Sequence, residues 1–311
     1  MNNNHFTIIT FYQFKVISNK DQFIYKLKDL CKFNKIRGTV IVADEGVNGT
    51  LAGLENSINK VIKIFKDNKF YDLNLKFSYY KYMPFQTLKI KNKKEIVTLR
   101  SKYSNPAKIS GKRISAEKWN SLIKKEDTLL IDVRNDFEVK MGTFQTAINP
   151  NTKSFTDFKN FVDKNLSKSK NKKIAMFCTG GIRCEKASSY MIAKGFKNIS
   201  QLDGGIINYL GKIPQSKSMW NGECFVFDNR VSLKNELKDG TYKLCHGCRS
   251  PISEKDLLSK FYNPGISCPK CFNKTSIEKK KNLAQRNKQI LLSKKRGMYN
   301  RFLRLTVDEY K

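Results

Sequence analysis

The sequence predicts a multidomain α/β protein of three successive modules: a split-βαβ sandwich, a parallel sheet covered by helices, and a smaller zinc-ribbon-like module. Three observations predict this fold. Strand and helix patterns follow the order β-α-β-β-α-β over residues 1–98, short apolar strands alternate with helices over 124–218, and two Cys-x2-Cys pairs lie within 219–275. The length of 311 residues fits about two ordinary domains with a smaller third.

The first module, residues 1–98, combines strands rich in β-branched and aromatic residues with helices of amphipathic spacing. Apolar residues recur every three or four positions in the expected helices, and a glycine-bearing turn at 45–49 joins the two central strands. We expect strands over 6–17, 38–44, 50–53 and 73–80, and helices over 21–33 and 57–65. This order in so short a stretch indicates a small split-βαβ sandwich.

Residues 99–123 are expected to form a linker and a lead-in helix. The pairs Asn105-Pro106 and Ser110-Gly111 interrupt regular structure, and Ser115 can cap a helix that runs to Leu122. In the central module we expect strands over 128–133, 174–177 and 199–202, and helices over 155–164, 185–194 and 205–210. Short apolar strands separated by helices indicate a parallel sheet that is buried on both faces.

The charge balance favours a polyanionic partner. Sixty Lys and Arg residues against 27 Asp and Glu give a net charge of +33 and an isoelectric point near 9.8. Such a field attracts nucleic acid, although a bias towards A+T-rich codons would also enrich Lys, Asn and Ile. Arg reads bases better than Lys does, so its scarcity favours phosphate contacts over groove readout.

The sequence gives no indication of a membrane or exported protein. It contains no apolar run of the ~18 residues that a membrane helix needs, and the first residues lack the pattern of a secretory signal. The eight cysteines are therefore expected to be reduced, metal-bound or catalytic rather than paired in disulfides. We expect a cytoplasmic protein with no membrane partner.

The sharpest chemical signal lies at the end of a buried strand, where Cys178 opens a short glycine-containing loop before a helix. The other residues of this active-site loop are Thr179, Gly180, Gly181, Ile182 and Arg183. Converging backbone N–H groups and the positive end of the helix would lower the pKa of Cys178 and make it a thiolate, with the fixed charge of Arg183 beside it. The alternative is a buried structural cysteine, the commoner fate of a single Cys. Cys184, at the start of the helix, is expected to point away from the loop.

The second signal is a pair of Cys-x2-Cys knuckles. Cys245 and Cys248 are separated from Cys268 and Cys271 by nineteen residues, a spacing that predicts tetrahedral binding of a structural Zn²⁺ by four thiolates. The alternative is four reduced surface cysteines. His246, between two ligands, is expected to be a turn residue.

Residues 276–311 form a basic tail. Between Lys274 and Lys311 there are twelve Lys or Arg residues against three acids, and the apolar residues are spaced loosely enough for an amphipathic helix. A solvated, structureless tail is an equal alternative. The candidate RNA-binding residues are Lys279, Lys280, Lys281 and Arg286.

The Cys178 loop resembles the active-site loop of rhodanese-like domains. The segments Ile131–Arg134, Gly142–Pro150 and Leu202–Ile206 resemble other markers of that family. Asp132 and Arg134 are expected to brace the end of the sheet rather than to act in catalysis. The Cys-x4-Arg loop has the length suited to a persulfide, whereas phosphatases on this fold need one more residue, so the resemblance disfavours a phosphatase.

The chain as a whole resembles the rhodanese-domain tRNA uridine hydroxylase family, from Ala43–Gly53 through the Cys178 loop and Trp220–Val231 to Gly265–Phe272. The resemblance implies an acylphosphatase-like first domain and an oxidoreductase that uses O₂ as co-substrate. It further implies hydroxylation of uridine 34, the wobble position of tRNA, to 5-hydroxyuridine, with tRNA rather than DNA as partner and Cys178 essential. The sequence contains no nucleotide-binding fingerprint, haem motif or two-His-one-carboxylate set, so the reductant is not predicted.

Two other functions stay open at this point. A sulfurtransferase would carry a persulfide on Cys178, and the zinc and N-terminal modules would then have no evident role. A non-catalytic RNA-binding protein would use only the positive charge and the zinc module.

Overall fold

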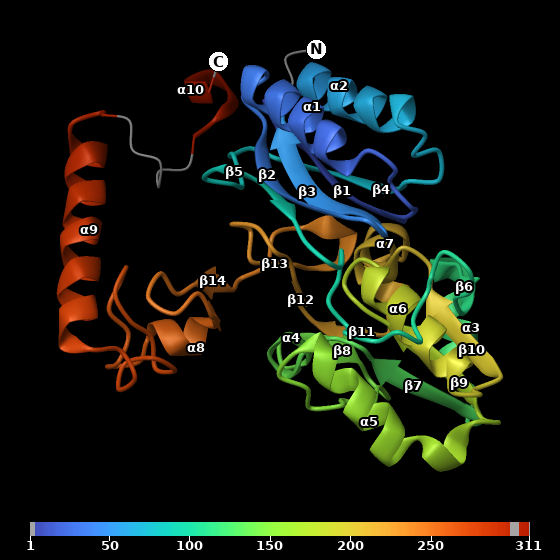
Figure 1. Cartoon of the computed structure of the whole chain (residues 1–311). Helices are drawn as coiled ribbons and strands as arrows, with labels where there is room; N and C mark the ends of the chain where they lie inside the picture. Colours follow the sequence, from blue (N-terminus) through green and yellow to red (C-terminus); the bar gives the residue numbers. More distant parts are fainter. Residues whose placement is uncertain (1–3, 299–304, 311) are drawn as a thin grey trace.

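The computed structural model describes residues 4–298 and 305–310 (Figure 1). An N-terminal domain, drawn in blue, lies against a central domain, drawn in green and yellow, and a four-cysteine module with a long helix follows (Figure 1). The predicted fold class is confirmed: a mixed α/β sheet, a central parallel sheet and a C-terminal four-cysteine cluster. In the described part of the chain, no helix is both long and apolar enough to cross a membrane.

The N-terminal domain follows the predicted β-α-β-β-α-β order and adds one strand. Its elements are β1 (Phe6–Phe14), α1 (Lys20–Phe33), β2 (Arg37–Ala43), β3 (Gly46–Gly53), α2 (Glu55–Asp67), β4 (Asn74–Tyr80) and β5 (Leu88–Asn92). The strand order is β4-β1-β3-β2-β5, antiparallel except for β5, which runs parallel to β2 at the edge. Strand β5 was not predicted, because an edge strand of alternating Lys and apolar residues carries only a weak pattern.

The two faces of this sheet have different partners, because successive side chains of a strand point to opposite faces. In β1, Ile9 and Phe11 pack against the apolar sides of α1 and α2. Phe6 and Ile8 point to the opposite face and pack against the C-terminal end of the chain, while Thr10 on the same face lines a cavity next to the central domain. The polar part of this second face therefore contributes to the candidate site.

The central domain contains a four-stranded parallel sheet of order β6-β10-β9-β7. Its elements are β6 (Lys112–Ile114), α3 (Ala116–Ile123), β7 (Thr128–Asp132), α4 (Asp136–Val139), β8 (Gly142–Phe144), α5 (Phe158–Asn165), β9 (Lys173–Phe177), α6 (Ile182–Ala193), β10 (Asn198–Leu202) and α7 (Gly205–Lys212). Short 3₁₀ turns occur at Phe155–Asp157, Ser167–Ser169, Gln215–Lys217 and Asn235–Leu237. One face of the sheet packs on α5 and α6 and the other on α3 and α7, so the predicted burial of both faces is confirmed.

Three short strands follow the central sheet and remain attached to it. Strand β11 (Trp220–Gly222) pairs with β8, and β12 (Cys224–Phe225) pairs with β13 (Ser232–Leu233). The ring of Trp220 lies 5.2 Å from that of Phe144, with the two planes nearly perpendicular. This packing holds the β12–β13 hairpin beside the central domain.

The C-terminal part contains β14 (Lys243–Leu244), β15 (Pro251–Ile252), α8 (Glu254–Leu257), α9 (Ile277–Lys295) and α10 (Val307–Tyr310). Much of the basic tail is therefore helical, although Leu283 is the one residue of α9 that is buried. Helix α10 lies beside the N-terminal domain (Figure 1), where Val307 and Tyr310 cover Phe6. The chain thus returns to the domain in which it began.

Candidate functional site

The loop after β9 places Cys178 between a strand and a helix, as predicted. Gly181, the residue before α6, has a φ of +100°, a conformation that glycine adopts without steric cost. Its N–H donates a hydrogen bond to the sulfur of Cys178 at 3.2 Å. A Cβ atom at Gly181 would lie 2.9 Å from the hydroxyl of Tyr12, so the glycine also allows the N-terminal domain to approach the loop.

The pKa of Cys178 is set by opposing effects. Burial raises the pKa of the thiol, but hydrogen bonds from the Cys184 thiol and from backbone N–H groups, together with the charge of Arg183, lower it from 9.0 to about 6. At neutral pH Cys178 is therefore a thiolate. A thiolate is the nucleophilic form of cysteine.

The expectation that Cys184 points away from the loop is wrong. Helix α6 begins at Ile182, earlier than predicted, and this places Cys184 in the first turn. Because Cα–Cβ bonds in a helix tilt towards its N-terminus, the thiol points back to Cys178 and donates to it. Burial and this hydrogen bond raise the pKa of Cys184, so it stays protonated.

Arg183 stands beside Cys178 but is held by a second charge. Its guanidinium donates two hydrogen bonds of 2.7 Å to the carboxylate of Glu138 and a third of 3.2 Å to the hydroxyl of Thr179. Burial opposes ionisation of Glu138, yet the Arg183 charge lowers its pKa. The buried pair fixes the position of the guanidinium. Sequence reasoning did not select Glu138, because its only local signal is a capping box with Asn135.

Helix α7 supports the loop from behind. The N–H groups of Ile206 and Ile207 donate to the carbonyl oxygens of Cys178 and Thr179 at 3.0 and 3.1 Å. A Cβ atom at Gly205 would lie 2.5 Å from the carbonyl oxygen of Cys178, so this position requires glycine. The Leu202–Ile206 segment therefore positions the Cys178 loop.

Asp132 and Arg134 brace the end of the sheet, as expected. The Arg134 guanidinium donates to the Asp132 carboxylate at 2.6 Å and to the carbonyl of Gly142 at 2.5 Å, and both side chains are fully buried. Neither residue lines the cavity at Cys178. Their role is structural.

The N-terminal domain contacts the Cys178 loop directly. Lys76, on β4, donates to the carbonyl of Gly180 at 3.0 Å, and the Tyr12 hydroxyl donates to the carboxylate of Glu185 at 3.4 Å. Burial lowers the pKa of Lys76 to about 8, against the opposing charges of Cys178 and Asp203. These contacts join the two domains at the loop.

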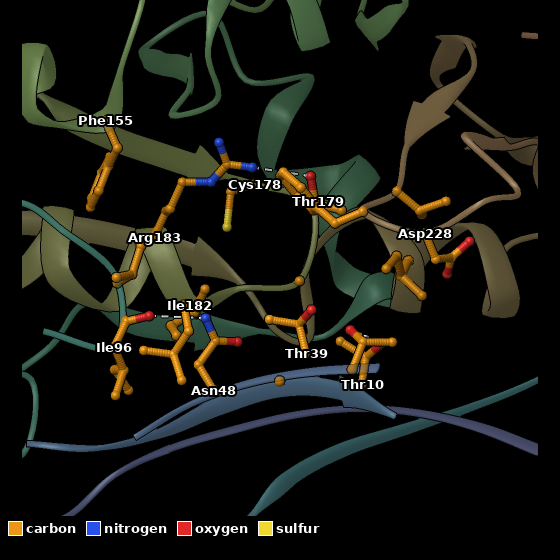
Figure 2. Close-up of a pocket in the computed structure, with 18 of the residues that line it drawn as sticks. Thr10, Thr39, Asn48, Ile96, Phe155, Cys178, Thr179, Ile182, Arg183 and Asp228 are labelled. Atoms are coloured by element: carbon orange, nitrogen blue, oxygen red, sulfur yellow. Dashed lines mark hydrogen bonds between the residues drawn. The ribbon is translucent and has the colours of Figure 1, made fainter. Parts of the chain in front are cut away.

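A cavity of about 650 Å³ lies where the domains meet. Figure 2 shows Thr10, Thr39 and Asn48 of the N-terminal sheet on one side of it, with Cys178 and Arg183 on the other. The β12–β13 hairpin closes a third side with Val226, Phe227, Asp228 and Arg230. The volume falls within the ~300–1,000 Å³ typical of sites for small organic ligands.

Sequence reasoning found the loop but missed the opposite wall of this cavity. Thr10 and Asn48 lie in strands that read as core strands, and no local motif distinguishes them. The one available signal was the polar Thr10 between buried neighbours in β1, which marks a face not fully covered by hydrophobic side chains.

The four predicted zinc ligands come together in one cluster. Their sulfur atoms all lie within 4.8 Å of one another, and the pairs Cys245–Cys271, Cys248–Cys268 and Cys268–Cys271 are separated by 3.9, 3.8 and 3.9 Å. A tetrahedral Zn²⁺ site with Zn–S bonds of ~2.3 Å has sulfur–sulfur separations of about 3.8 Å. The geometry and the donor set therefore fit a metal ion such as zinc, held by four thiolates with no open position. His246 is not part of the cluster.

The candidate RNA-binding residues all lie on α9, and none lines the Cys178 cavity. Lys279 and Lys281 are exposed. The Lys280 ammonium lies 4.1 Å from the ring centre of Phe272, and Arg286 donates to the carbonyl of His246 at 3.2 Å. The structure thus separates these cations from the nucleophile.

Comparisons with known proteins agree with the first two modules. Residues 6–96 match the model of the UPF0176 acylphosphatase-like domain, and residues 115–212 match that of the rhodanese-like domain. A rhodanese-like domain protein from Staphylococcus aureus is 26% identical, over 32% of this chain and 90% of that one, with a TM-score of 0.27. A rhodanese-related protein from Thermoplasma volcanium is 25% identical, over 33% of this chain and 95% of that one, with a TM-score of 0.27. A rhodanese-like domain from Anabaena sp. is 19% identical, over 35% of this chain and 78% of that one, with a TM-score of 0.29. On the two family models, this chain contains a domain that matches the UPF0176 acylphosphatase-like domain, followed by a rhodanese-like domain.

Proposed function

We propose that this protein hydroxylates uridine 34 of tRNA to 5-hydroxyuridine, with O₂ as the oxygen source and Cys178 as the nucleophile. The observation that carries the proposal is a thiolate with a pKa of about 6 in a cavity of about 650 Å³. A cavity of this size accepts a nucleoside, and a cysteine thiolate adds readily to the electron-poor C6 of uracil.

The chemistry balances with one external reductant. Addition of the Cys178 thiolate to C6 makes C5 nucleophilic, and C5 then takes up O₂ and one proton to form a C5 hydroperoxide. A two-electron reductant and two protons cleave the O–O bond, which leaves a hydroxyl on C5 and releases water. Loss of the C5 proton and departure of the thiolate restore the C5–C6 double bond.

The residues around Cys178 support this chemistry. The thiolate is held by the Gly181 N–H and the Cys184 thiol, and both donors also stabilise it as the leaving group. Across the cavity, the side-chain NH₂ of Asn48 donates to the carbonyl of Ile96 at 3.0 Å (Figure 2). This hydrogen bond fixes the orientation of the side-chain oxygen of Asn48. An amide oxygen can accept the N3–H of uracil and thereby orient the ring.

The charge of the chain supports a polyanionic substrate. A net charge of +33 favours the approach of RNA, and the exposed lysines of α9 offer contacts to phosphates away from the cavity. Single-stranded anticodon bases can be splayed out and inserted into such a pocket.

The rhodanese-type loop favours a second candidate, a sulfurtransferase that carries a persulfide on Cys178. Mass spectrometry of tRNA nucleosides distinguishes the candidates, using cells that lack the gene and the same cells with the wild-type gene restored. Loss of 5-hydroxyuridine and its derivatives supports the hydroxylase, whereas loss of a thiolated nucleoside supports the sulfurtransferase. An unchanged set of nucleosides contradicts both and favours a binding protein.

A further inference from the structure

A second cavity of about 230 Å³ adjoins the Cys178 cavity. The residues that line both cavities are Thr39, Phe85, Val226, Phe227 and Asp228. The two spaces are therefore neighbours with a shared wall. A chain-like ligand bound in the first cavity can therefore extend into the second.

The shared wall presents an exposed aromatic ring. Phe227, in the β12–β13 hairpin, is 66% exposed, which is unusual for so large an apolar side chain in a well-packed region. Its ring makes an edge contact with Phe225 at 5.0 Å, and the Arg183 guanidinium lies 6.0 Å from its centre. A flat, solvent-facing ring at the mouth of a cavity is a platform on which a nucleobase can stack.

The hairpin that carries Phe227 is firmly held. The Arg230 guanidinium pairs with the Asp228 carboxylate at 2.6 Å and also donates to the hydroxyl of Ser78 in the N-terminal domain at 2.9 Å. The N–H of Val226 donates to the carbonyl of Val231 at 2.9 Å. The exposure of Phe227 is therefore fixed by the fold, and the negative charge of Asp228 in the wall is neutralised by Arg230.

Two cations from different modules line the second cavity. Lys89 comes from β5 of the N-terminal domain, and Arg249 directly follows the cysteine-cluster residue Cys248. Both side chains are exposed, and neither forms an ion pair or hydrogen bond with any other residue in 4–298 or 305–310. The backbone N–H of Arg249 donates to the carbonyl of Cys245 at 2.8 Å, which ties the main chain at Arg249 to the cysteine cluster.

We propose that the second cavity binds the nucleotide next to the target uridine in the RNA strand. Phe227 stacks on its base, and Lys89 and Arg249 contact its phosphate. The assignment rests on the proposed function, since it requires a target nucleoside within a polynucleotide. It also gives the four-cysteine module a direct task at the site, which is to hold Arg249 at the second cavity.

The test measures RNA binding by the full zinc-loaded chain, independently of turnover. The probes are a tRNA anticodon stem-loop with uridine at the wobble position and free uridine. We expect Phe227→Ala to weaken binding of the stem-loop roughly 5- to 150-fold, the range that stacking of one base provides. Binding of free uridine, which has no neighbouring nucleotide to stack on Phe227, should weaken by a smaller factor. Phe227→Trp should bind the stem-loop as the wild type does. Phe33→Ala, which removes an exposed ring from α1, is the matched control.

The cations are tested by the salt dependence of the same binding. Arg249→Gln and Lys89→Gln should each reduce the log–log salt slope by about 0.7. Lys260→Gln, in the same module as Arg249 but outside both cavities, should leave the slope unchanged.

Two results overturn the assignment in distinguishable ways. The second cavity is not a nucleotide site if the wild type binds the stem-loop and Phe227→Ala binds it equally well. The same conclusion follows if Phe227→Ala weakens the binding of free uridine by as large a factor as the binding of the stem-loop. If the wild type binds no RNA, the proposed function fails together with this inference.

Discussion

At the scale of single residues, the reactivity of Cys178 depends on a few donors that lie within one helical turn. Burial alone would raise the pKa of this thiol, as it does for Cys31 and Cys224, whose pKa values rise to about 12. In Cys178 the hydrogen bonds and the Arg183 charge reverse the effect. The loop therefore lowers the pKa of one buried cysteine, whereas burial raises the pKa of two others elsewhere in the fold.

Alkylation should report this difference. Because deprotonation creates the nucleophile, the rate of Cys178 alkylation by iodoacetamide should rise with pH to a plateau, with a midpoint near pH 6 rather than 9. Cys31 and Cys224 should remain unmodified over the same range. The measurement is peptide mass spectrometry of the zinc-loaded protein across a pH series. A midpoint above pH 8 would contradict the assignment of a thiolate.

Cys184 offers a sharper test of the cause. Replacing it with Ala removes a hydrogen bond to a charged sulfur, worth about 1.5–3 kcal/mol, and should move the alkylation midpoint of Cys178 upward by roughly 1 to 2 pH units. Cys184→Ser keeps a donor of similar size and serves as the control. Equal midpoints for the Ala variant and the wild type would show that the Cys184 thiol does not lower the pKa of Cys178.

The loop could be predicted from the sequence because its residues are contiguous: the strand, Cys178, the glycines and the helix start follow one another. Its partners could not. Glu138 meets Arg183 across 45 positions within the central domain, and this contact exists only once that domain has folded. Lys76 meets Gly180 across 104 positions, and this contact exists only after the two domains have packed together. The orientation of Cys184 was missed for a smaller reason, a shift of the helix start by three residues.

At the scale of elements, strong hydrophobic periodicity predicted most helices and strands. The short strands at the edges of the two sheets, β5 and β6, carry only a weak pattern and were not predicted. Strand β6 lies in a stretch that reads as a linker, and its three residues acquire strand structure only by pairing with β10. The 3₁₀ turn and helix over 155–165 appeared in the sequence as one helix. Short elements of this kind depend on tertiary contacts more than on local pattern.

The four-cysteine module should contain one Zn²⁺ per chain. Cys248→Ser should lose the metal and unfold the module, since metal binding supplies folding free energy to such small units. Metal analysis and hydrogen exchange over residues 243–272 would check both effects. His246→Ala should retain the ion, because His246 lies outside the cluster. Metal-free protein with native exchange protection in this region would contradict the prediction.

Helix α9 is expected to contact phosphates of the tRNA. The test must leave α10 in place, because α10 packs against the N-terminal domain. Deleting the tail would also remove α10 and expose Phe6 and Ile8. Replacing Lys279, Lys281 and Lys288 with Gln keeps α10 in place and should reduce the salt slope of tRNA binding by ~0.7–0.9 per lost contact. The control replaces the three exposed lysines of α1, Lys26, Lys28 and Lys32, with Gln, which changes the net charge by the same amount. An unchanged slope would show that α9 does not bind RNA.

At the scale of the whole molecule, the candidate site belongs to no single domain. The rhodanese-like domain supplies the nucleophile, the N-terminal sheet supplies the opposite wall, and the β12–β13 hairpin closes the third side. Lys186 adds to the junction through ion pairs with Glu45 at 2.8 Å and Glu95 at 2.5 Å. The Cys178 loop, whose thiol is fully buried, thereby lines a cavity of about 650 Å³ between the domains.

This arrangement also explains which parts of the function the sequence could suggest. The Cys178 loop indicated a reactive thiol and the charge indicated a polyanion, because both are properties of contiguous or summed residues. The enclosure of the thiol by Thr10, Thr39 and Asn48 depends on which face of the N-terminal sheet meets the central domain. Helices α1 and α2 cover one face of the N-terminal sheet, so the other face is the one that packs against the central domain.

In the proposed reaction, Cys178 directs oxygen from O₂ onto a tRNA uridine, and isotope labelling tests this most directly. Cells that lack the gene, carrying either the wild-type gene or Cys178→Ser, are grown under O₂ enriched in the heavy isotope, and the tRNA nucleosides are examined by mass spectrometry. We predict labelled 5-hydroxyuridine with the wild-type gene, and with Cys178→Ser no more than in cells without the gene. Labelled 5-hydroxyuridine at wild-type abundance in the Cys178→Ser cells, or wild-type 5-hydroxyuridine without the label, would contradict the account.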